Sequence, residues 1–119
     1  MNPRNRGQKT APLEAVVDTS TELTWLPMDV LWEIGVTPRR LETLPISPEV
    51  AVERGVGYVI MLANGRETPQ EVVFAEPGER LRVGTKALQG FGIEIVSAKH
   101  AFIDVATMAA FYMGNRRRF

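Results

Sequence analysis

The spacing of apolar and polar residues predicts many short strands. Several segments are rich in β-branched and aromatic residues, and Gly, Pro and Asn positions typical of turns separate them. The predicted strands cover residues 13–17, 23–26, 40–46, 50–62, 71–74, 93–95 and 102–105. Residues 93–95 alternate cleanly between apolar and polar, and residues 102–105 are suited to pair with them.

Two segments have the pattern of short helices. Pro27 suits the first position of a helix and Gly35 its end, while Val30, Leu31 and Ile34 fall on one helical face. We therefore expect this helix to pack on the body of the protein. A second short helix is predicted at residues 85–89.

The turn signals connect these elements into a mostly β fold. Asn64-Gly65 favours the type I′ turn of a β-hairpin, and residues 76–79 have the composition of a second turn. The order of elements lacks the strand-helix-strand repetition of a parallel α/β sheet. The pattern predicts one mostly β, barrel-like domain with one or two short helices.

Composition narrows the classes of partner and cofactor. The 119 residues include 14 basic and 14 acidic side chains, and this zero net charge argues against nucleic acid or an anionic membrane as partner. The chain has no cysteine and a single histidine, His100, so we expect no metal and no cofactor. With no apolar run of membrane-spanning length, we expect a cytoplasmic protein. Trp25, Trp32 and Phe74 are interpreted as core or dimer-interface residues.

Asp18 carries the most informative local pattern in the chain. It follows the apolar strand at residues 13–17, and Thr19 and Ser20 come directly after it. A carboxylate at the end of a buried strand is costly unless it accepts hydrogen bonds or shares a proton with another acid. The pattern therefore fits either a structural Asx-type turn or a catalytic carboxylate presented on a loop.

A second segment, at residues 81–93, favours the catalytic interpretation of Asp18 over the structural turn. It reads as a strand, Gly84, a short helix and a further strand. Together with the Asp18 segment it resembles the retropepsin-like aspartic proteases, in particular the single-domain bacterial relatives of the retroviral enzymes. In that family an apolar strand enters Asp-Thr-Gly or Asp-Ser-Gly, and a later apolar-apolar-Gly leads into a short helix. The resemblance covers roughly residues 13–105 and implies a closed acid-protease-like barrel.

The resemblance implies an aspartic endopeptidase in which two carboxylates share one proton. One carboxylate acts as a general base on water, and the other, protonated, polarises the scissile carbonyl. The chain has three aspartates, and neither Asp29 in a predicted helix nor Asp104 in a terminal strand resembles a second active-site loop. One chain thus supplies half of a dyad, and a two-fold homodimer that binds an extended peptide would supply both halves.

Specific roles follow from the resemblance, residue by residue. Asp18 would be the catalytic acid and base, Thr19 would bond across the two-fold axis, and the backbone N–H of Ser20 would donate to the carboxylate. Ser20 departs from the family's Gly and adds a side chain near the substrate. Gly84 would lie under the active-site loop, and Leu88 would pack the helix that follows.

The family closes a hairpin, the flap, over its substrate. By position the flap here lies within residues 44–57, and its expected substrate-binding residues are Leu44, Ile46, Ser47, Pro48 and Glu49. The two prolines predict a stiff tip, which still allows closure about hinges. Arg82 stands where the family usually has an apolar residue, and we expect it to point outward with its stem on the surface.

The predicted organisation has three parts. Residues 1–12 form a loose N-terminal segment, residues 13–106 the retropepsin-like domain, and residues 107–119 a C-terminal tail. The tail is apolar and helix-compatible over residues 108–113, and we consider that it caps the partner subunit. Two alternatives to the protease stay open: a catalytically inactive dimeric peptide-binding module with the same fold, and a monomeric β-barrel adaptor in which Asp18 closes a turn.

Overall fold

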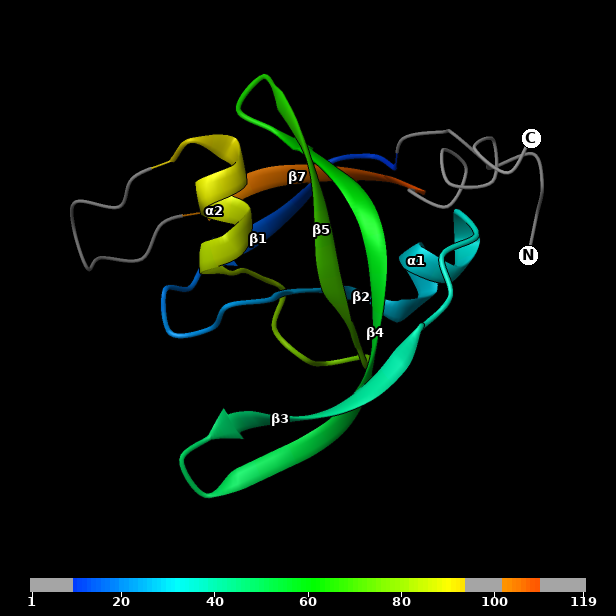
Figure 1. Cartoon of the computed structure of the whole chain (residues 1–119), viewed down its shortest axis with the longest axis vertical. Helices are drawn as coiled ribbons and strands as arrows, with labels where there is room; N and C mark the ends of the chain where they lie inside the picture. The colour runs from blue at the N-terminus through cyan, green and yellow to red at the C-terminus, as the bar shows by residue number, and fades with distance from the viewer. Residues whose placement is uncertain (1–9, 94–101, 110–119) are drawn as a thin grey trace.

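The computed structural model describes residues 10–93 and 102–109 (Figure 1). Seven strands and two helices form within these residues. In chain order they are β1 (Leu13–Val17), β2 (Thr24–Pro27), α1 (Met28–Glu33), β3 (Arg40–Ser47), β4 (Val50–Ala63), β5 (Arg66–Ala75), β6 (Arg82–Val83), α2 (Thr85–Phe91) and β7 (Phe102–Ala109). Most of the predicted strands are confirmed, with boundaries within a few residues.

The strands form one sheet that closes on itself. Their order is β3-β4-β5-β2-β6-β1-β7, and β7 also pairs with β4, so the strands from β4 round to β7 make a ring. β1 pairs with β6 and β2 with β5 in parallel, whereas the other pairings are antiparallel. The predicted mostly β fold with a closed sheet is confirmed, and a ring of strands describes it best.

Backbone dihedral angles explain two of the connections. Asn64 and Gly65 both have positive φ, 53° and 68°, which is the signature of the predicted type I′ turn between β4 and β5. Gly35 has φ 88° and directs the chain away from α1, as predicted for a helix end.

The start of α1 differs from the prediction. Pro27 is not the first helical residue; it is the last residue of β2, with ψ of 132°, and α1 begins at Met28. The physical reason is pairing with β5, which continues through the partners Pro27 and Ala75 and keeps Pro27 extended. Proline donates no hydrogen bond, so it is tolerated at the end of a strand.

The C-terminal strand extends further than predicted. β7 pairs with β1 through Phe102–Val105 and then with β4 as far as Ala109, so residues 107–109 are strand and not helix. This places them in the ring, three residues beyond the predicted end of the domain. The predicted strand at residues 93–95 and His100 lie largely or wholly outside the described residues.

The core consists of two apolar clusters. The larger lies inside the ring and includes Leu26, Leu31 and Phe91; the smaller surrounds Trp25 and includes Val56 and Val73. Trp25 and Phe74 are buried as predicted, while Trp32 is 45% exposed and makes an edge contact with Phe74. Among the described residues no helix is long and apolar enough to span a membrane.

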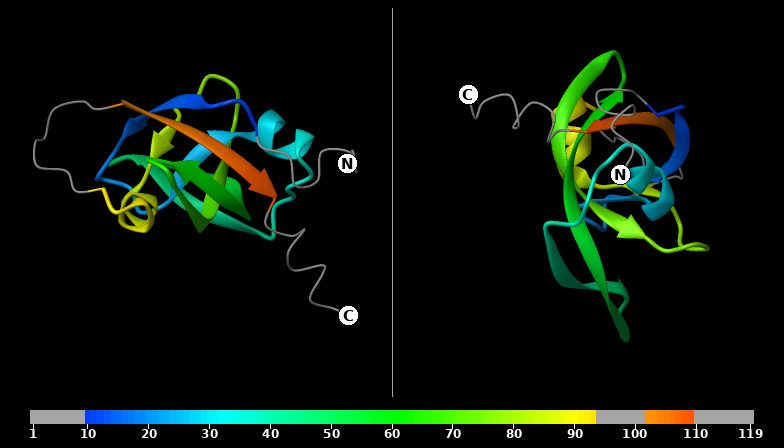
Figure 2. Two further views of the ribbon diagram at one scale, coloured as in Figure 1. Left: turned by 90° about the horizontal axis from the view of Figure 1, so that it is seen from above. Right: turned by 90° about the vertical axis from the view of Figure 1, so that its right-hand side faces the viewer.

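The β3–β4 hairpin extends from the ring of strands, as Figures 1 and 2 show. Its strands pair from Arg40 with Val56 out to Ser47 with Val50, so Pro48 and Glu49 form the tip. The hairpin tip thus falls within residues 44–57, the segment predicted for the flap, whose role in binding substrate stays a prediction. Within the hairpin, the paired residues Leu44 and Val52 pack against the Trp25 cluster, which anchors the hairpin to the body.

Candidate active site

The Asp18 carboxylate is held by its own loop. The backbone N–H of Asp18 donates to the carbonyl of Val83 at 3.0 Å, which continues the parallel pairing of β1 and β6 by one residue. Ser20 donates twice to Oδ1 of Asp18, from its backbone N–H at 2.9 Å and from its hydroxyl at 2.5 Å. The carboxylate thus accepts the hydrogen bonds that a strand-end acid requires, and the loop fixes its orientation.

These contacts set the charge state of Asp18 in the single chain. Partial burial raises the pKa of Asp18, but the hydroxyl and N–H of Ser20 and the positive charges of Arg82 and Arg80 together outweigh burial. The pKa of Asp18 therefore lies below its ordinary value of 3.8. An isolated protomer keeps this carboxylate ionised at neutral pH.

Gly84 lies directly against the Asp18 loop. A Cβ at this position would lie 2.5 Å from the carbonyl oxygen of Glu22 and 2.6 Å from that of Leu23. The start of α2 donates to the same loop, from the N–H of Thr85 to Thr21 at 2.9 Å and from Lys86 to Glu22 at 3.2 Å. The loop approaches β6 and α2 so closely that only glycine fits.

Two further residues complete this support. The N–H of Gly84 donates to the hydroxyl of Thr24 at 3.1 Å, and both groups are buried. Leu88 in α2 is 4% exposed and belongs to the larger apolar cluster, so it ties the helix to the core. Gly84 thus lies against the Asp18 loop, and Leu88 holds α2 on the core; their role in an active site stays a prediction.

A cleft of about 630 Å³ lies between the Asp18 loop and the β3–β4 hairpin. Its walls include Trp25 on the body, and five of the residues expected from the sequence for the loop and the flap. These five are Ser20, Leu44, Ile46, Ser47 and Pro48. Segments far apart in the sequence therefore meet at one cleft, next to the candidate catalytic carboxylate. Thr19 is exposed at the tip of the loop.

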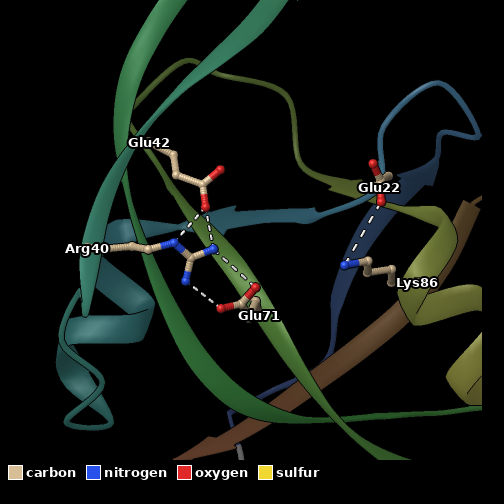
Figure 3. A network of polar contacts seen from close by, with 5 residues as sticks. All are labelled: Glu22, Arg40, Glu42, Glu71 and Lys86. Atoms are coloured by element: carbon tan, nitrogen blue, oxygen red, sulfur yellow. Dashed lines mark hydrogen bonds and ion pairs between the residues drawn. The ribbon is translucent and has the colours of Figure 1, made fainter.

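Charged side chains that line the same cleft form one group of three and one pair (Figure 3). Arg40 lies between Glu42 and Glu71 and bonds to both carboxylates. Lys86 faces Glu22 at 3.9 Å. Hydrogen bonds from Arg40 lower the pKa of Glu71, so this pair stays ionised. The described residues contain no group of three or more His, Asp or Glu placed to share a metal ion.

Arg82 does not point outward, contrary to the expectation from sequence. Its side chain is only 17% exposed, its guanidinium lies 4.8 Å from the centre of the Trp25 ring, and its Nη1 lies 3.8 Å from Oδ2 of Asp18. The reason is strand register, because Trp25 and Arg82 are direct partners in the β2–β6 pairing. Attraction of the cation to the indole face favours this position.

A comparison with solved structures supplies the context for this geometry. The EIAV protease complexed with the inhibitor HBY-793 matches with a TM-score of 0.56, over 82% of this chain and 99% of that chain, at 17% sequence identity. The chain has a retropepsin-like fold. No family model matches the sequence, and no curated protein does.

Within this retropepsin-like fold, the sequence predicted the Asp18 loop, Gly84 and Leu88 behind it, and the hairpin tip. It placed Arg82 on the surface and assigned no role near the loop to Trp25 or Thr24. Leu81, Arg82 and Val83 alternate between apolar and charged side chains, which weakly indicates that Arg82 lies on the opposite face of this short strand from its two neighbours. Which face meets the cleft depends on the partner strand, and that pairing is not local.

Proposed function

We propose that the protein is an aspartic endopeptidase that acts as a homodimer on peptides in an extended conformation. The observation that carries this proposal is the Asp18 carboxylate, held by Ser20 beside a cleft under a long hairpin, in a retropepsin-like fold. We propose that two such chains combine as in the single-domain members, because the described residues form one lobe with one candidate acid. We keep the cytoplasm as its proposed location.

The chemistry follows from two Asp18 carboxylates across a two-fold axis. Like charges about 3 Å apart cannot both ionise, so the pair holds one proton, as in known aspartic proteases. The ionised member takes a proton from water, whose oxygen attacks the scissile carbonyl carbon. The protonated member donates to the carbonyl oxygen. Collapse of the tetrahedral intermediate breaks the C–N bond, and a proton passes to the leaving amine.

The hairpin supplies the other half of substrate binding. Extended peptides bind in such clefts by main-chain pairing, with alternate side chains in pockets. Ile46, 39% exposed, and Leu44 in the same strand of the hairpin offer apolar contacts on the cleft wall. Closure of the tip would exclude water, which strengthens the electrostatic interactions in the site.

One observation favours the alternative, a dimeric peptide-binding module without turnover. Ser20 gives Oδ1 of Asp18 two donors and Arg82 lies near Oδ2, so the carboxylate is strongly held in its ionised form. A dyad that cannot retain its shared proton binds peptide but does not hydrolyse it. This alternative predicts binding without cleavage.

Two measurements test the proposal. Sedimentation equilibrium over a wide concentration range should show a dimer, and a persistent monomer would exclude the dyad and favour the adaptor. Cleavage of a peptide library by the wild type should disappear in Asp18→Asn, with the dimer still folded. Turnover that persists in Asp18→Asn would reject Asp18 as the catalytic group. Equal binding by both proteins without cleavage by either would support the binding module.

A further inference from the structure

Arg82 is a cation in the wall of the cleft, close to the candidate catalytic acid. Its Nη1 lies 3.8 Å from Oδ2 of Asp18, and its side chain is 17% exposed. The indole of Trp25 supports the guanidinium at 4.8 Å. This contact fixes the position of an otherwise flexible side chain, so the charge has a defined place in the cleft.

The hydrogen-bonding capacity of Arg82 is largely unused. Its Nε is buried without a partner among the described residues, and 3.8 Å from Nη1 to Asp18 is too long for a hydrogen bond. Arg40, which lines the same cleft, is in contrast bonded to two glutamates. A guanidinium offers five N–H donors in a planar fork that matches a carboxylate.

The two acidic side chains near Arg82 do not hydrogen-bond to it: Oδ2 of Asp18 faces Arg82 but lies 3.8 Å from its Nη1. Glu79 accepts two hydrogen bonds from Arg54, at 3.1 and 2.7 Å, and a third from the N–H of Glu76 at 2.8 Å. Oδ1 of Asp18 accepts both donors of Ser20. The Nε of Arg82 is buried and out of reach, so a carboxylate from outside the described chain is the natural partner for the Nη donors of Arg82 in the cleft wall.

We propose that Arg82 is a specificity-determining residue that selects peptides with Asp or Glu next to the scissile bond. This inference rests on the proposed function and names its substrate class. Extended peptides rise about 3.3 Å per residue, so a guanidinium beside the Asp18 carboxylate reaches only side chains that flank the bond being cut. In a two-fold dimer each subunit contributes one Arg82, so an acid is selected on either side of the bond.

The net charge at the centre of the cleft is compatible with an acidic substrate side chain next to Arg82. The dyad holds one proton and thus one negative charge, while the two Arg82 side chains carry two positive charges. The centre of the cleft therefore has a net positive charge before substrate binds. A substrate carboxylate neutralises it, whereas a neutral side chain leaves guanidinium donors unpaired, which is costly at a partly buried site.

The test compares peptides that differ only in Glu or Gln at a residue flanking the bond. The wild type should cleave the Glu peptide with at least about tenfold higher kcat/KM, the size expected for hydrogen bonds to a charged group. In Arg82→Gln and Arg82→Leu the ratio should fall to near one. Lys86→Leu is the matched control, because Lys86 lines the same cleft but faces Glu22; it should keep the ratio.

The outcomes separate this inference from the proposed function. Equal cleavage of both peptides by the wild type, or an unchanged ratio in Arg82→Gln, would overturn the role of Arg82 and leave the protease intact. If the wild type cleaves neither peptide, the proposed function fails, and fluorescence anisotropy with the same two peptides then decides. Tighter binding of the Glu peptide, lost in Arg82→Gln, would uphold the carboxylate site, and equal binding would overturn it.

Discussion

Replacing Gly84 with alanine tests how the Asp18 loop is held in place. The new Cβ would meet the carbonyl oxygens of Glu22 and Leu23 at 2.5 and 2.6 Å, whereas real Cβ atoms essentially never come closer than 3.0 Å. Both obstacles are backbone atoms, so no side chain can rotate away. The loop has to move by roughly half an ångström, which is the overlap that the overpacked site must relieve.

This movement has a cost that the surrounding contacts define. It stretches the hydrogen bonds from Thr85 to Thr21 and from Lys86 to Glu22, each with a net contribution of about 0.5–1.5 kcal/mol. Overpacking adds about 1–3 kcal/mol. We therefore expect Gly84→Ala to lower the free energy of unfolding by about 2–6 kcal/mol and to reduce cleavage, because Asp18 lies at the start of the displaced loop.

Urea unfolding at one fixed protein concentration measures this loss, with the fluorescence of the tryptophans as the signal. Gly78→Ala is the matched control, because Gly78 has φ 89° but no atom within 4 Å of its added Cβ. It carries only the cost of a left-handed residue, about 1–2 kcal/mol. If Gly84→Ala lowers the free energy of unfolding no more than Gly78→Ala, the close approach of loop and β6 is not what requires glycine.

Two further substitutions test the support and the charge of Asp18. Thr24→Val should lower the free energy of unfolding by about 1–3 kcal/mol, because the buried N–H of Gly84 loses its acceptor. Thr43→Val, on the exposed hairpin, is the control and should change this free energy little. Equal effects of the two substitutions would contradict the role of the Thr24 hydroxyl as the acceptor for Gly84. Ser20→Ala removes a donor that lowers the pKa of Asp18, so this pKa should rise. Because the pKa of Asp18 is lowered in the folded state, its ionised carboxylate stabilises the fold above about pH 3.8. This stabilisation is lost as the pH falls through the lowered pKa. In protein dilute enough to be monomeric, Ser20→Ala should thus be less stable than the wild type at pH 7, with the difference shrinking in acid; a pH-independent difference would refute this.

Local chemistry explains why much of the fold was predictable from sequence. Asn64-Gly65 specifies a turn through its own backbone preferences, and the apolar strand before Asp18 ends where the first polar residues begin. These signals need no knowledge of distant partners. The hairpin tip at Pro48 follows in the same way, from two strand-forming segments on either side of it.

Features that depend on strand pairing were not predictable. Pro27 is compatible with both a helix start and a strand end, and its pairing with Ala75 decides between them. The local sequence around Arg82 predicts an ordinary surface residue, whereas the β2–β6 register places it against Trp25. Such contacts join residues more than forty positions apart, and the local pattern of one strand does not encode them. The candidate site therefore emerged from sequence as a loop and a hairpin, without the cation between them.

The central claim is that each active site needs Asp18 from two chains, and a subunit-mixing experiment tests it most directly. Wild type and Asp18→Asn are mixed at constant total concentration, well above the dimer dissociation constant, and allowed to exchange subunits. If both carboxylates are required, only wild-type homodimers cleave, and an equal mixture retains about one quarter of the wild-type rate. A rate of about one half would mean that each subunit cleaves with its own Asp18, and it would contradict the shared dyad.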